Sequence, residues 1–299
     1  MRVWRIYFQE PKVAGTGARW LAGTLVMACL LLAGPSVSNG AYTAGPLPAG
    51  APREVVPNRV MTWNICNPCK GSGQNGGRAA EIATYAPQVI GLQEACVGDV
   101  QRIRDYLRYR YGRVYHVEYG SVLPSWSRCG GVPWSPGGFG QAILSAAPMT
   151  DHVNVEYPHG GSEDRGYMAV TTLVDGRRVR VFNTHLAQRR QQAVRAEQAG
   201  VLAKAVVRYD RAIVLGDFNA VPDASELTVM WRMARDADAA CGPSGAGPCE
   251  PTTDWRSKFD YIFLRGFGPL EQRVHPTPWS DHDLVRADLS ADVSRRSAR

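Results

Sequence analysis

The 299-residue sequence has no internal repeat and no low-complexity tract, and only 20% of its residues are charged. Hydrophobic residues make up 44%, alongside 31 glycines and 20 prolines. This balance excludes a collagen-like chain, a coiled coil and a wholly disordered protein. A globular chain of this length buries about three quarters of the surface that its unfolded form exposes. It therefore needs neither a metal nor a disulfide merely to fold.

The sequence also lacks the full set of cysteine and histidine pairs that a structural zinc site needs. Cys66 and Cys69 form a Cys-x-x-Cys pair, but no second such pair and no pair of histidines follows at the spacing of a structural zinc site. Zinc is therefore the less favoured interpretation of this pair, and a disulfide is the favoured one. The sequence leaves the partners open, since these cysteines can pair with each other or with Cys96 and Cys129.

The cysteine count supports disulfides elsewhere too. One of the seven cysteines lies in an N-terminal apolar stretch, and the remaining six are an even number. An even number favours disulfides when the chain is exported. Cys241 and Cys249 flank a short loop rich in glycine and proline, so we expect them to pair.

Long uncharged runs are rare, and the N-terminal one, residues 20–34, is short for a membrane span of about 20 residues. Four cations precede it, and small and polar residues follow it. This order is typical of a secretory signal peptide, which we expect within residues 1–40. An uncleaved N-terminal anchor is the alternative. Both interpretations place the folded part outside the cytoplasm, so we expect a secreted protein.

The chain carries a formal net charge of +7 and a pI near 9.1. Four cations and one anion before residue 40 supply three of these charges, and the rest of the chain keeps +4. A modest positive charge suits a polyanionic substrate, and solubility alone explains it equally well.

Residues 41–57 are rich in proline, alanine and glycine and are interpreted as a linker. After it, apolar strands alternate with helical stretches, which predicts one mixed α/β domain over residues 58–292 and a tail over 293–299. Strands are expected at 59–63, 88–93, 114–118, 141–145, 167–174, 178–184, 211–216, 259–264 and 284–289, and helices at 78–85, 99–109, 189–208 and 224–235. Residues 121–140 are interpreted as one long loop, and long loops in compact domains are usually functional.

Polar side chains follow several of the apolar strands. Residues 213–219 run from an apolar strand into Asp217 and Asn219, which lie two positions apart and so point to the same side of an extended backbone. Such a pair suits a hard metal ion or an attacking water, although an Asx-rich turn has the same residues. The other strand-end residues of this kind are Asn64, Glu94, His185, Asp260, Asp281 and His282.

In their order along the chain, the strings TWN, QE, NTHL, GDFN, FDYIF and SDH resemble the endonuclease/exonuclease/phosphatase superfamily. That superfamily includes pancreatic-type deoxyribonucleases, exonuclease-III-like enzymes, bacterial neutral sphingomyelinases and inositol-phosphate 5-phosphatases. The resemblance covers residues 59–290. It implies a four-layered α/β sandwich, in which two mixed β-sheets pack face to face with helices on the outside. It also implies a metal-dependent hydrolase of phosphoric esters.

The resemblance implies a metal site made of Asn64, Glu94 and Asp281. In it, Glu94 is the main ligand of a divalent cation, Asn64 supports it, and Asp281 completes the metal side. The expected ion is Mg²⁺, with Mn²⁺ as an alternative, because a hard cation that keeps several waters suits oxygen ligands and phosphate substrates.

The resemblance also implies the catalytic roles. Asp217 orients or deprotonates the attacking water, and Asn219 helps to position the water or the phosphate. His282 contacts the scissile phosphate and takes part in proton transfer, while Asp260 holds the imidazole in one tautomer.

Two further residues complete this implied set. His185 binds a phosphate oxygen or protonates the leaving group, and Arg165 matches an arginine that neutralises charge on the phosphoryl oxygens in some members. The sequence departs from many members after residue 145, where Ala146 and Ala147 stand in place of Arg or Lys.

Three classes of function follow. The first is a nuclease that acts on DNA or RNA as a monomer, favoured by the pI and by two runs of arginines that could contact phosphates. These are Arg102, Arg104, Arg108, Arg110 and Arg113, and then Arg189, Arg190 and Arg195. The second is a sphingomyelinase-like or phospholipase C-like lipid phosphodiesterase, or a phosphatase of small phosphoesters. Trp126 and Trp134 could enter a membrane interface, although they could equally stack on bases. The third is a binding protein without activity, which the retained catalytic residues argue against.

Overall fold

Apolar strands pair into two six-stranded sheets in the computed structural model, which describes residues 45–245 and 247–290. The order in the first sheet is β13 (Gly268–His275), β14 (Leu284–Ser290), β1 (Val56–Asn64), β2 (Pro87–Cys96), β6 (Gly138–Ser145) and β3 (His116–Pro124). The order in the second sheet is β11 (Arg235–Asp236), β12 (Asp260–Arg265), β10 (Ala212–Asp217), β9 (Arg177–His185), β8 (Gly166–Val174) and β7 (Thr150–Glu156). Two short strands, β4 (Gly131–Val132) and β5 (Ser135–Pro136), form a separate hairpin.

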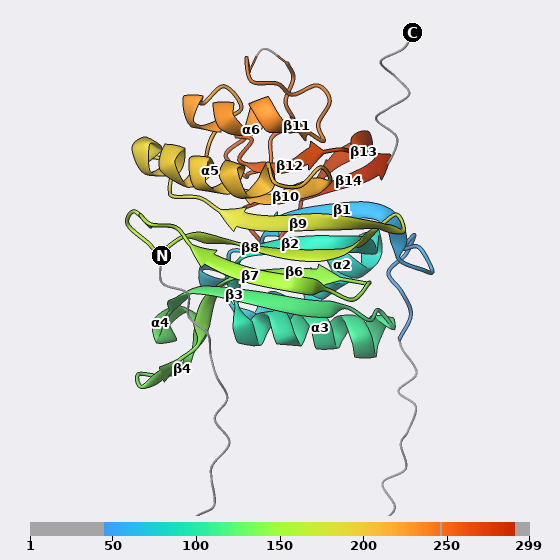
Figure 1. Ribbon diagram of the computed structural model, residues 1–299. Helices are drawn as coiled ribbons and strands as arrows, with labels where there is room; N and C mark the ends of the chain where they lie inside the picture. The colour runs from blue at the N-terminus through green and yellow to red at the C-terminus, as the bar shows by residue number, and fades with distance from the viewer. Residues whose placement is uncertain (1–44, 246, 291–299) are drawn as a thin grey trace, which may run out of the picture. The chain divides into compact units, whose positions relative to one another are not determined.

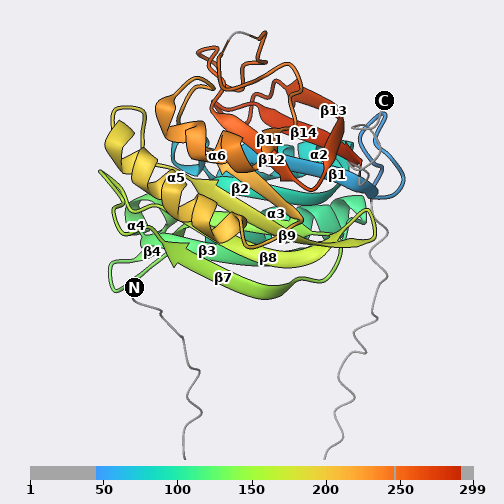
Figure 2. The ribbon, with the colours of Figure 1, turned by 45° about the horizontal axis from the view of Figure 1, so that its top comes forward.

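The described helices are α1 (Asn67–Lys70), α2 (Asn75–Tyr85), α3 (Val97–Tyr111), α4 (Trp126–Cys129), α5 (Gln192–Val206) and α6 (Thr228–Met233), with 3-10 turns at Ser72–Gln74 and Ser225–Leu227. The outer faces of the two sheets are covered by four of them, α2, α3, α5 and α6. In Figure 1, α3 and α5 lie on opposite outer sides of the sheets, and Figure 2 shows α5 lying across the second sheet.

Three hydrophobic clusters separate these layers. The central cluster joins inward residues of both sheets, such as Val60 and Ile143 of the first and Val181 and Ile213 of the second. A second cluster packs the first sheet against α2 and α3, and a third packs the second sheet against α5 and α6. The four-layered α/β sandwich is therefore confirmed.

A polar bridge crosses the central layer near one end of the strands. Gln93 Nε2 donates to Asn183 Oδ1 at 2.6 Å, and Asn183 Nδ2 donates to the carbonyl of Leu92 at 2.9 Å. Gly91 permits this approach, because a Cβ there would lie 2.6 Å from Asn183 Oδ1. The bridge fixes how the two sheets are aligned at that end.

Parallel pairing gathers the ends of strands from both sheets there. β1 runs parallel to β2, with Asn64 opposite Gln93, and β9 runs parallel to β10, with His185 opposite Asp217. The antiparallel strand β12 begins at Asp260, directly opposite Asp217. The carboxyl ends of parallel strands lie at the same edge of a sheet, which is where open α/β sheets place their ligands.

Several sequence expectations need correction. β7 and β13 were not predicted, because they are edge strands in which no residue is fully buried, and they lack the apolar pattern of a buried strand. Residues 121–140 are not one loop, since they contain the end of β3, helix α4, the β4–β5 hairpin and the start of β6. Strand β1 begins at Val56, within the stretch interpreted as a linker.

The predicted disulfide between Cys241 and Cys249 is confirmed. Of the open alternatives, Cys66 pairs with Cys69, and Cys96 pairs with Cys129. None of the described helices is long and apolar enough to cross a membrane. The predicted signal peptide and tail lie outside the described residues.

Candidate active site

Asp217, at the end of β10, lies between two histidines. Its Oδ2 accepts a hydrogen bond from Asn64 Nδ2 at 3.1 Å and lies 3.3 Å from His185 Nε2 and 3.8 Å from His282 Nε2. Its Oδ1 accepts from the backbone N–H of Asn219 at 2.8 Å. Burial by itself would raise the pKa of Asp217, but the two imidazoles and this backbone hydrogen bond hold it well below its usual range. The carboxylate is therefore ionised at neutral pH.

Asp260 and His282 form a buried pair beside this carboxylate. His282 Nδ1 donates to Asp260 Oδ2 at 2.8 Å, and Thr252 Oγ1 donates to the same oxygen at 2.7 Å. Burial alone would lower the pKa of His282, but Asp260 and Asp217 together raise it to about 10. Burial likewise raises the pKa of Asp260, and His282 offsets only part of that increase. His282 is therefore protonated at neutral pH, with Nε2 facing Asp217.

Arg165 fixes the protonation of the other histidine. Its Nη1 lies 2.8 Å from His185 Nδ1, and because a guanidinium only donates, Nδ1 accepts. The proton of the neutral imidazole is then on Nε2, which faces Asp217 Oδ2. Asn219 Nδ2 donates to the carbonyl of Leu186 at 3.1 Å and lies 3.0 Å from His185 Nε2. Both histidines thus face the Asp217 carboxylate through Nε2.

Glu94 is the more accessible carboxylate of the cluster, with 23% of its side chain exposed against 1% for Asp217. Its Oε1 accepts from Asn64 Nδ2 at 3.3 Å and lies 3.9 Å from His185 Nε2. A register shift in β2 surrounds Glu94, and its φ of 49° lies in the left-handed region. Asn219 has a φ of 50°. Such backbones cost roughly 1–3 kcal/mol each, and cluster at functional sites.

These residues fit a hard divalent cation. Glu94 and Asp217 offer carboxylate oxygens beside the Asn64 amide, and such oxygen donors suit Mg²⁺ or Mn²⁺ better than a thiophilic ion. Asn64 Oδ1 accepts from the backbone N–H of Cys66 at 3.0 Å, so its amide nitrogen is the atom that faces the carboxylates. In this arrangement Asn64 holds both acidic side chains in place.

Asp281 lies beside the Cys66–Cys69 disulfide. Its Oδ1 is 3.8 Å from Cys69 Sγ, and Ser280 Oγ lies 3.5 Å from the same oxygen. Ser280 Oγ also donates to the carbonyl of Asn64 at 2.6 Å, which ties the loop of Asp281 to the end of β1. Ligation of a metal by Asp281 stays a prediction.

Four residues that the sequence did not indicate surround the predicted ones. Thr252 and Ser280 are described above. Glu163 Oε2 pairs with Arg165 Nη2 at 3.1 Å, and the half-exposed ring of Trp255 meets the imidazole of His282 edge-on, with centroids 5.4 Å apart. All four lie in loops, where no periodic pattern signals a role.

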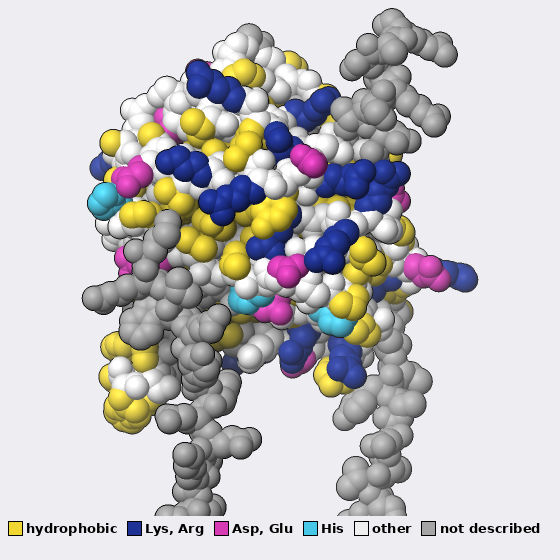
Figure 3. Space-filling view, in the orientation of Figure 1, with side chains coloured by type: hydrophobic (Ala, Val, Ile, Leu, Met, Phe, Trp, Pro, Cys, Tyr) yellow, Lys and Arg dark blue, Asp and Glu magenta, His cyan; other side chains and the backbone are white. Residues whose placement is uncertain are grey.

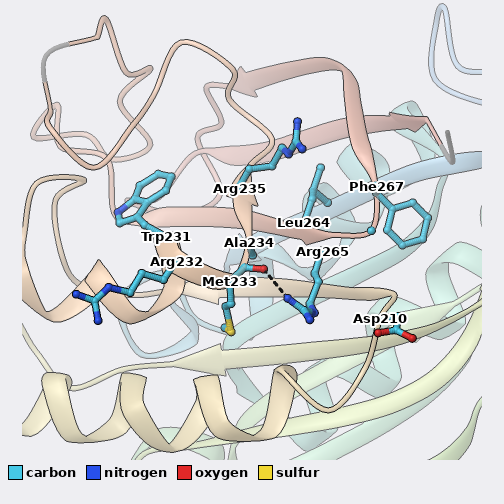
Figure 4. Close-up of a pocket in the computed structure, with 10 residues that line it drawn as sticks. Asp210, Trp231, Arg232, Met233, Ala234, Arg235, Leu264, Arg265 and Phe267 are labelled. Atoms are coloured by element: carbon cyan, nitrogen blue, oxygen red, sulfur yellow. Dashed lines mark hydrogen bonds between the residues drawn. The ribbon is translucent and has the colours of Figure 1, made fainter. Parts of the chain in front are cut away.

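A cavity of about 400 Å³ lies elsewhere, at the opposite end of β12 (Figure 4). Its lining includes Trp231, Arg265 and Phe267, and Arg265 Nη1 donates to the carbonyl of Met233 at 3.1 Å. Asp260 begins the six-residue strand that Arg265 ends, so about 17 Å of strand separates this cavity from the site.

Comparisons with known proteins agree with this geometry. The model of the endonuclease/exonuclease/phosphatase family matches residues 61–282. No curated protein matches the chain. A solved endonuclease/exonuclease/phosphatase from Beutenbergia cavernae DSM 12333 is 24% identical, with a TM-score of 0.65, over 78% of this chain and 71% of that one.

Two further solved structures share the fold. Humanized D. rerio TDP2 is 18% identical, with a TM-score of 0.61, over 78% of this chain and 98% of that one. The catalytic domain of human Nocturnin with bound sulfate is 21% identical, with a TM-score of 0.59, over 78% of this chain and 94% of that one.

Proposed function

The chain belongs to the endonuclease/exonuclease/phosphatase family, and from this premise we propose that it is a secreted, Mg²⁺-dependent phosphodiesterase. The observation that carries the proposal is the position of Asp217, whose Oδ2 lies 3.3 Å from His185 Nε2 and 3.8 Å from His282 Nε2, beside the more accessible Glu94. A carboxylate that orients water and an acid that donates a proton are the two groups that hydrolysis of a phosphodiester needs.

The metal site of the proposal consists of Glu94 as the main ligand, with Asn64 and Asp281 beside it. When bound there, Mg²⁺ would neutralise charge on the phosphoryl oxygens. Asp217 holds the attacking water through a carboxylate oxygen, since its low pKa favours orienting the water over removing its proton. Asn219 lies next to Asp217 and is placed to bind the water or a phosphoryl oxygen.

The two histidines have different tasks at the phosphate. His282 is protonated and held by Asp260, so its Nε2 can donate to an oxygen of the phosphate. His185 carries a proton on Nε2 because Arg165 occupies Nδ1, so it can donate a hydrogen bond to a phosphoryl oxygen. The buried Arg165 adds positive charge behind His185.

We propose nucleic acid as the first substrate. Arg189 and Arg190 are exposed just after β9, which ends at His185, and could contact flanking phosphates. A solved relative, D. rerio TDP2, is complexed with single strand DNA product. The arginines of α3 support this less, since Arg113 is buried and donates to backbone carbonyls, and Arg110 lies at the far end of the helix from Glu94.

A lipid phosphodiester is the second candidate substrate. The observation that favours it is the exposure of Trp126 and Trp134 on a segment next to β6, at the same end of the sheet as Glu94. The choice between the two substrates depends on surfaces around the site and not on the residues within it.

The test uses mature protein from Ala41 with Mg²⁺ and an EDTA control. It is incubated with plasmid DNA, RNA, and vesicles containing sphingomyelin or phosphatidylcholine. We expect EDTA-sensitive cleavage of nucleic acid, lost in Glu94→Ala and kept in Glu54→Ala, an exposed control. Release of phosphocholine with intact nucleic acid would move the assignment to a lipid. Full activity of Glu94→Ala would refute the metal site.

Secretion and a monomeric state are also part of the proposal. The support is the order of charge, apolar run and small residues in positions 1–40. Expression of the full chain in a bacterial host should release a mature protein that begins near residue 41, as mass spectrometry of the medium would show. Light scattering should give the mass of one chain.

A further inference from the structure

The segment between β3 and β6, residues 125–137, projects from the first sheet and is called the tryptophan loop below. The two flanking strands pair up to Pro124 and Gly138, so the whole segment leaves the sheet at one point. Helix α4 and the β4–β5 hairpin form it, closed by backbone hydrogen bonds from Ser125 N to Gly137 O and from Gly137 N to Gly130 O. Figure 1 shows it standing away from the sheets.

The tip of this loop is apolar, exposed and uncharged. Trp134 is 85% exposed and Trp126 57%, and Val132 and Pro133 are exposed between them. Residues 129–141 contain no Asp, Glu, Lys or Arg. Figure 3 shows hydrophobic side chains on this projection at the lower left. Exposed aromatic side chains gathered on one projection mark an interaction site more often than isolated ones do.

The base of the loop is fixed to the edge of the active site. Cys129 is bonded to Cys96, which lies two residues after Glu94. Arg128 pairs with Glu163, and Glu163 pairs with Arg165, the residue that contacts His185. A partner that binds the tip of the tryptophan loop would therefore lie on the same side of the molecule as Glu94 and Arg165.

We propose that the tryptophan loop docks the enzyme on a lipid bilayer with anionic headgroups, by inserting Trp126 and Trp134 at the interface. Indole rings favour the boundary between headgroups and acyl chains. The exposed cation Lys70 lies at the end of α1, which contacts α4, and Arg128 of α4 is also exposed, although it pairs with Glu163. They can face lipid phosphates when the tip is inserted.

The charge distribution favours a bilayer over a nucleic-acid strand. Platforms that stack bases combine aromatic side chains with a positively charged groove that follows the backbone. Here the tip itself is uncharged, and its rings stand on a projection. An uncharged apolar tip near the exposed cations Lys70 and Arg128 matches the depth profile of a bilayer interface.

Docking would present the active site to phosphoesters at the membrane surface. This consequence rests on the proposed function, whereas docking itself does not, because binding can be measured without turnover. The two are kept apart by measuring binding in EDTA and, separately, Mg²⁺-dependent hydrolysis of the soluble phosphodiester bis(4-nitrophenyl) phosphate.

The experiment is co-sedimentation of the mature protein with vesicles of equal parts phosphatidylcholine and phosphatidylglycerol. The variant is Trp126→Ala/Trp134→Ala, and the matched control is Val114→Ala/Leu270→Ala, which removes two exposed apolar side chains elsewhere. We expect the tryptophan variant to bind vesicles about a hundredfold more weakly, since each large apolar side chain withdrawn from water is worth roughly tenfold. The control variant should bind like the unchanged protein.

Three outcomes would overturn the proposal: no vesicle binding by the unchanged protein, equal binding by the tryptophan variant, or an equal loss in the control variant. A single-stranded oligonucleotide is the parallel probe. If the tryptophan variant lost oligonucleotide binding and kept vesicle binding, the loop would be a base-stacking platform and not a membrane contact. Hydrolysis of the soluble phosphodiester should be the same in all three proteins, which shows that the variants are folded.

Discussion

Two buried carboxylates near the same strand ends have very different neighbours. Asp99, in the first turn of α3, is 3% exposed, and Asp217 at the end of β10 is 1% exposed. The donors to Asp99 are Asn67 Nδ2 at 2.6 Å, Asn75 Nδ2 at 2.6 Å, Arg102 Nη1 at 2.9 Å and Ser72 Oγ at 3.2 Å. The neighbours of Asp217 are the side-chain amide of Asn64, the backbone N–H of Asn219 and two histidines.

The different neighbours indicate that the Asp99 cluster has a structural role and that the Asp217 cluster has a chemical one. Amide, hydroxyl and guanidinium donors keep their protons at neutral pH, so the Asp99 cluster can only hold its surroundings in place. It holds α1 and the turn after it, and Asn67 Oδ1 also accepts from the backbone N–H of Cys96, near Glu94. An imidazole can donate or accept a proton at a ring nitrogen, so the neighbours of Asp217 can take part in a reaction.

The strongest test of this comparison is Asp217→Asn. The amide keeps the shape of the side chain but removes the charge that orients water between the histidines. We expect turnover of a phosphodiester to fall about a thousandfold, within the range of a lost acid–base group. Asp223→Asn, at an exposed position, is the control and should retain its rate. A normal rate in Asp217→Asn would place the reactive carboxylate elsewhere.

The next test removes one histidine. His282→Ala should lower turnover by about a hundredfold or more, because the protonated imidazole held by Asp260 is lost. Circular dichroism should show a folded protein. A variant of normal rate would mean that His282 is not the acid, and the same change at His185 would then be the one to measure.

Substitution in the Asp99 cluster is expected to reduce stability more than the catalytic rate. Asp99→Ala leaves four donors without their acceptor, which we expect to cost about 3 kcal/mol in the free energy of unfolding. Urea denaturation measures this, with Asp105→Ala on the same helix as the exposed control. The rate per folded molecule should change less than it does in Asp217→Asn. A large loss of activity with unchanged stability would contradict the distinction between the two clusters.

Much of the Asp217 cluster could be predicted from the sequence, while the Asp99 cluster could not. Asn64, His185 and Asp217 end apolar strands, and parallel pairing brings such ends to one edge. Asp99 gives no such signal, because its partners come from a turn and a short helix whose path depends on the whole fold. Thr252 is unpredictable for the same reason, although it donates to Asp260 at 2.7 Å.

The edge strands show a related limit. β7 and β13 each pair on one side and contain no fully buried residue, so their residues alternate little between apolar and polar. Their pairing is decided by the neighbouring strand, which a single stretch of sequence does not contain. The structure of residues 125–137 could not be predicted either, because it depends on turns and on a disulfide between two cysteines that are distant in the sequence.

The smallest expected effect concerns the pH dependence of stability and a half-buried side chain outside both clusters, His275. His275 on β13 stacks on Tyr85, with ring centroids 4.1 Å apart. Burial, followed by the positive charges of Arg286 and Arg59, lowers the pKa of His275 to about 4, whereas carboxylates raise the pKa of His282 to about 10. The pKa of a histidine is thus lowered in one part of the molecule and raised in another.

The sign of its effect on stability follows from linkage. Between about pH 4 and about pH 6.5 the unfolded chain binds a proton at His275 that the folded chain does not, so this residue lowers stability as the pH falls. Because the ring is only half-buried, we expect roughly 1 kcal/mol between about pH 7 and about pH 5. His275→Gln should flatten that dependence in urea denaturation, and His116→Gln, at an exposed position, should not. Parallel curves for His275→Gln and the unchanged protein would show that the imidazole does not sense these arginines.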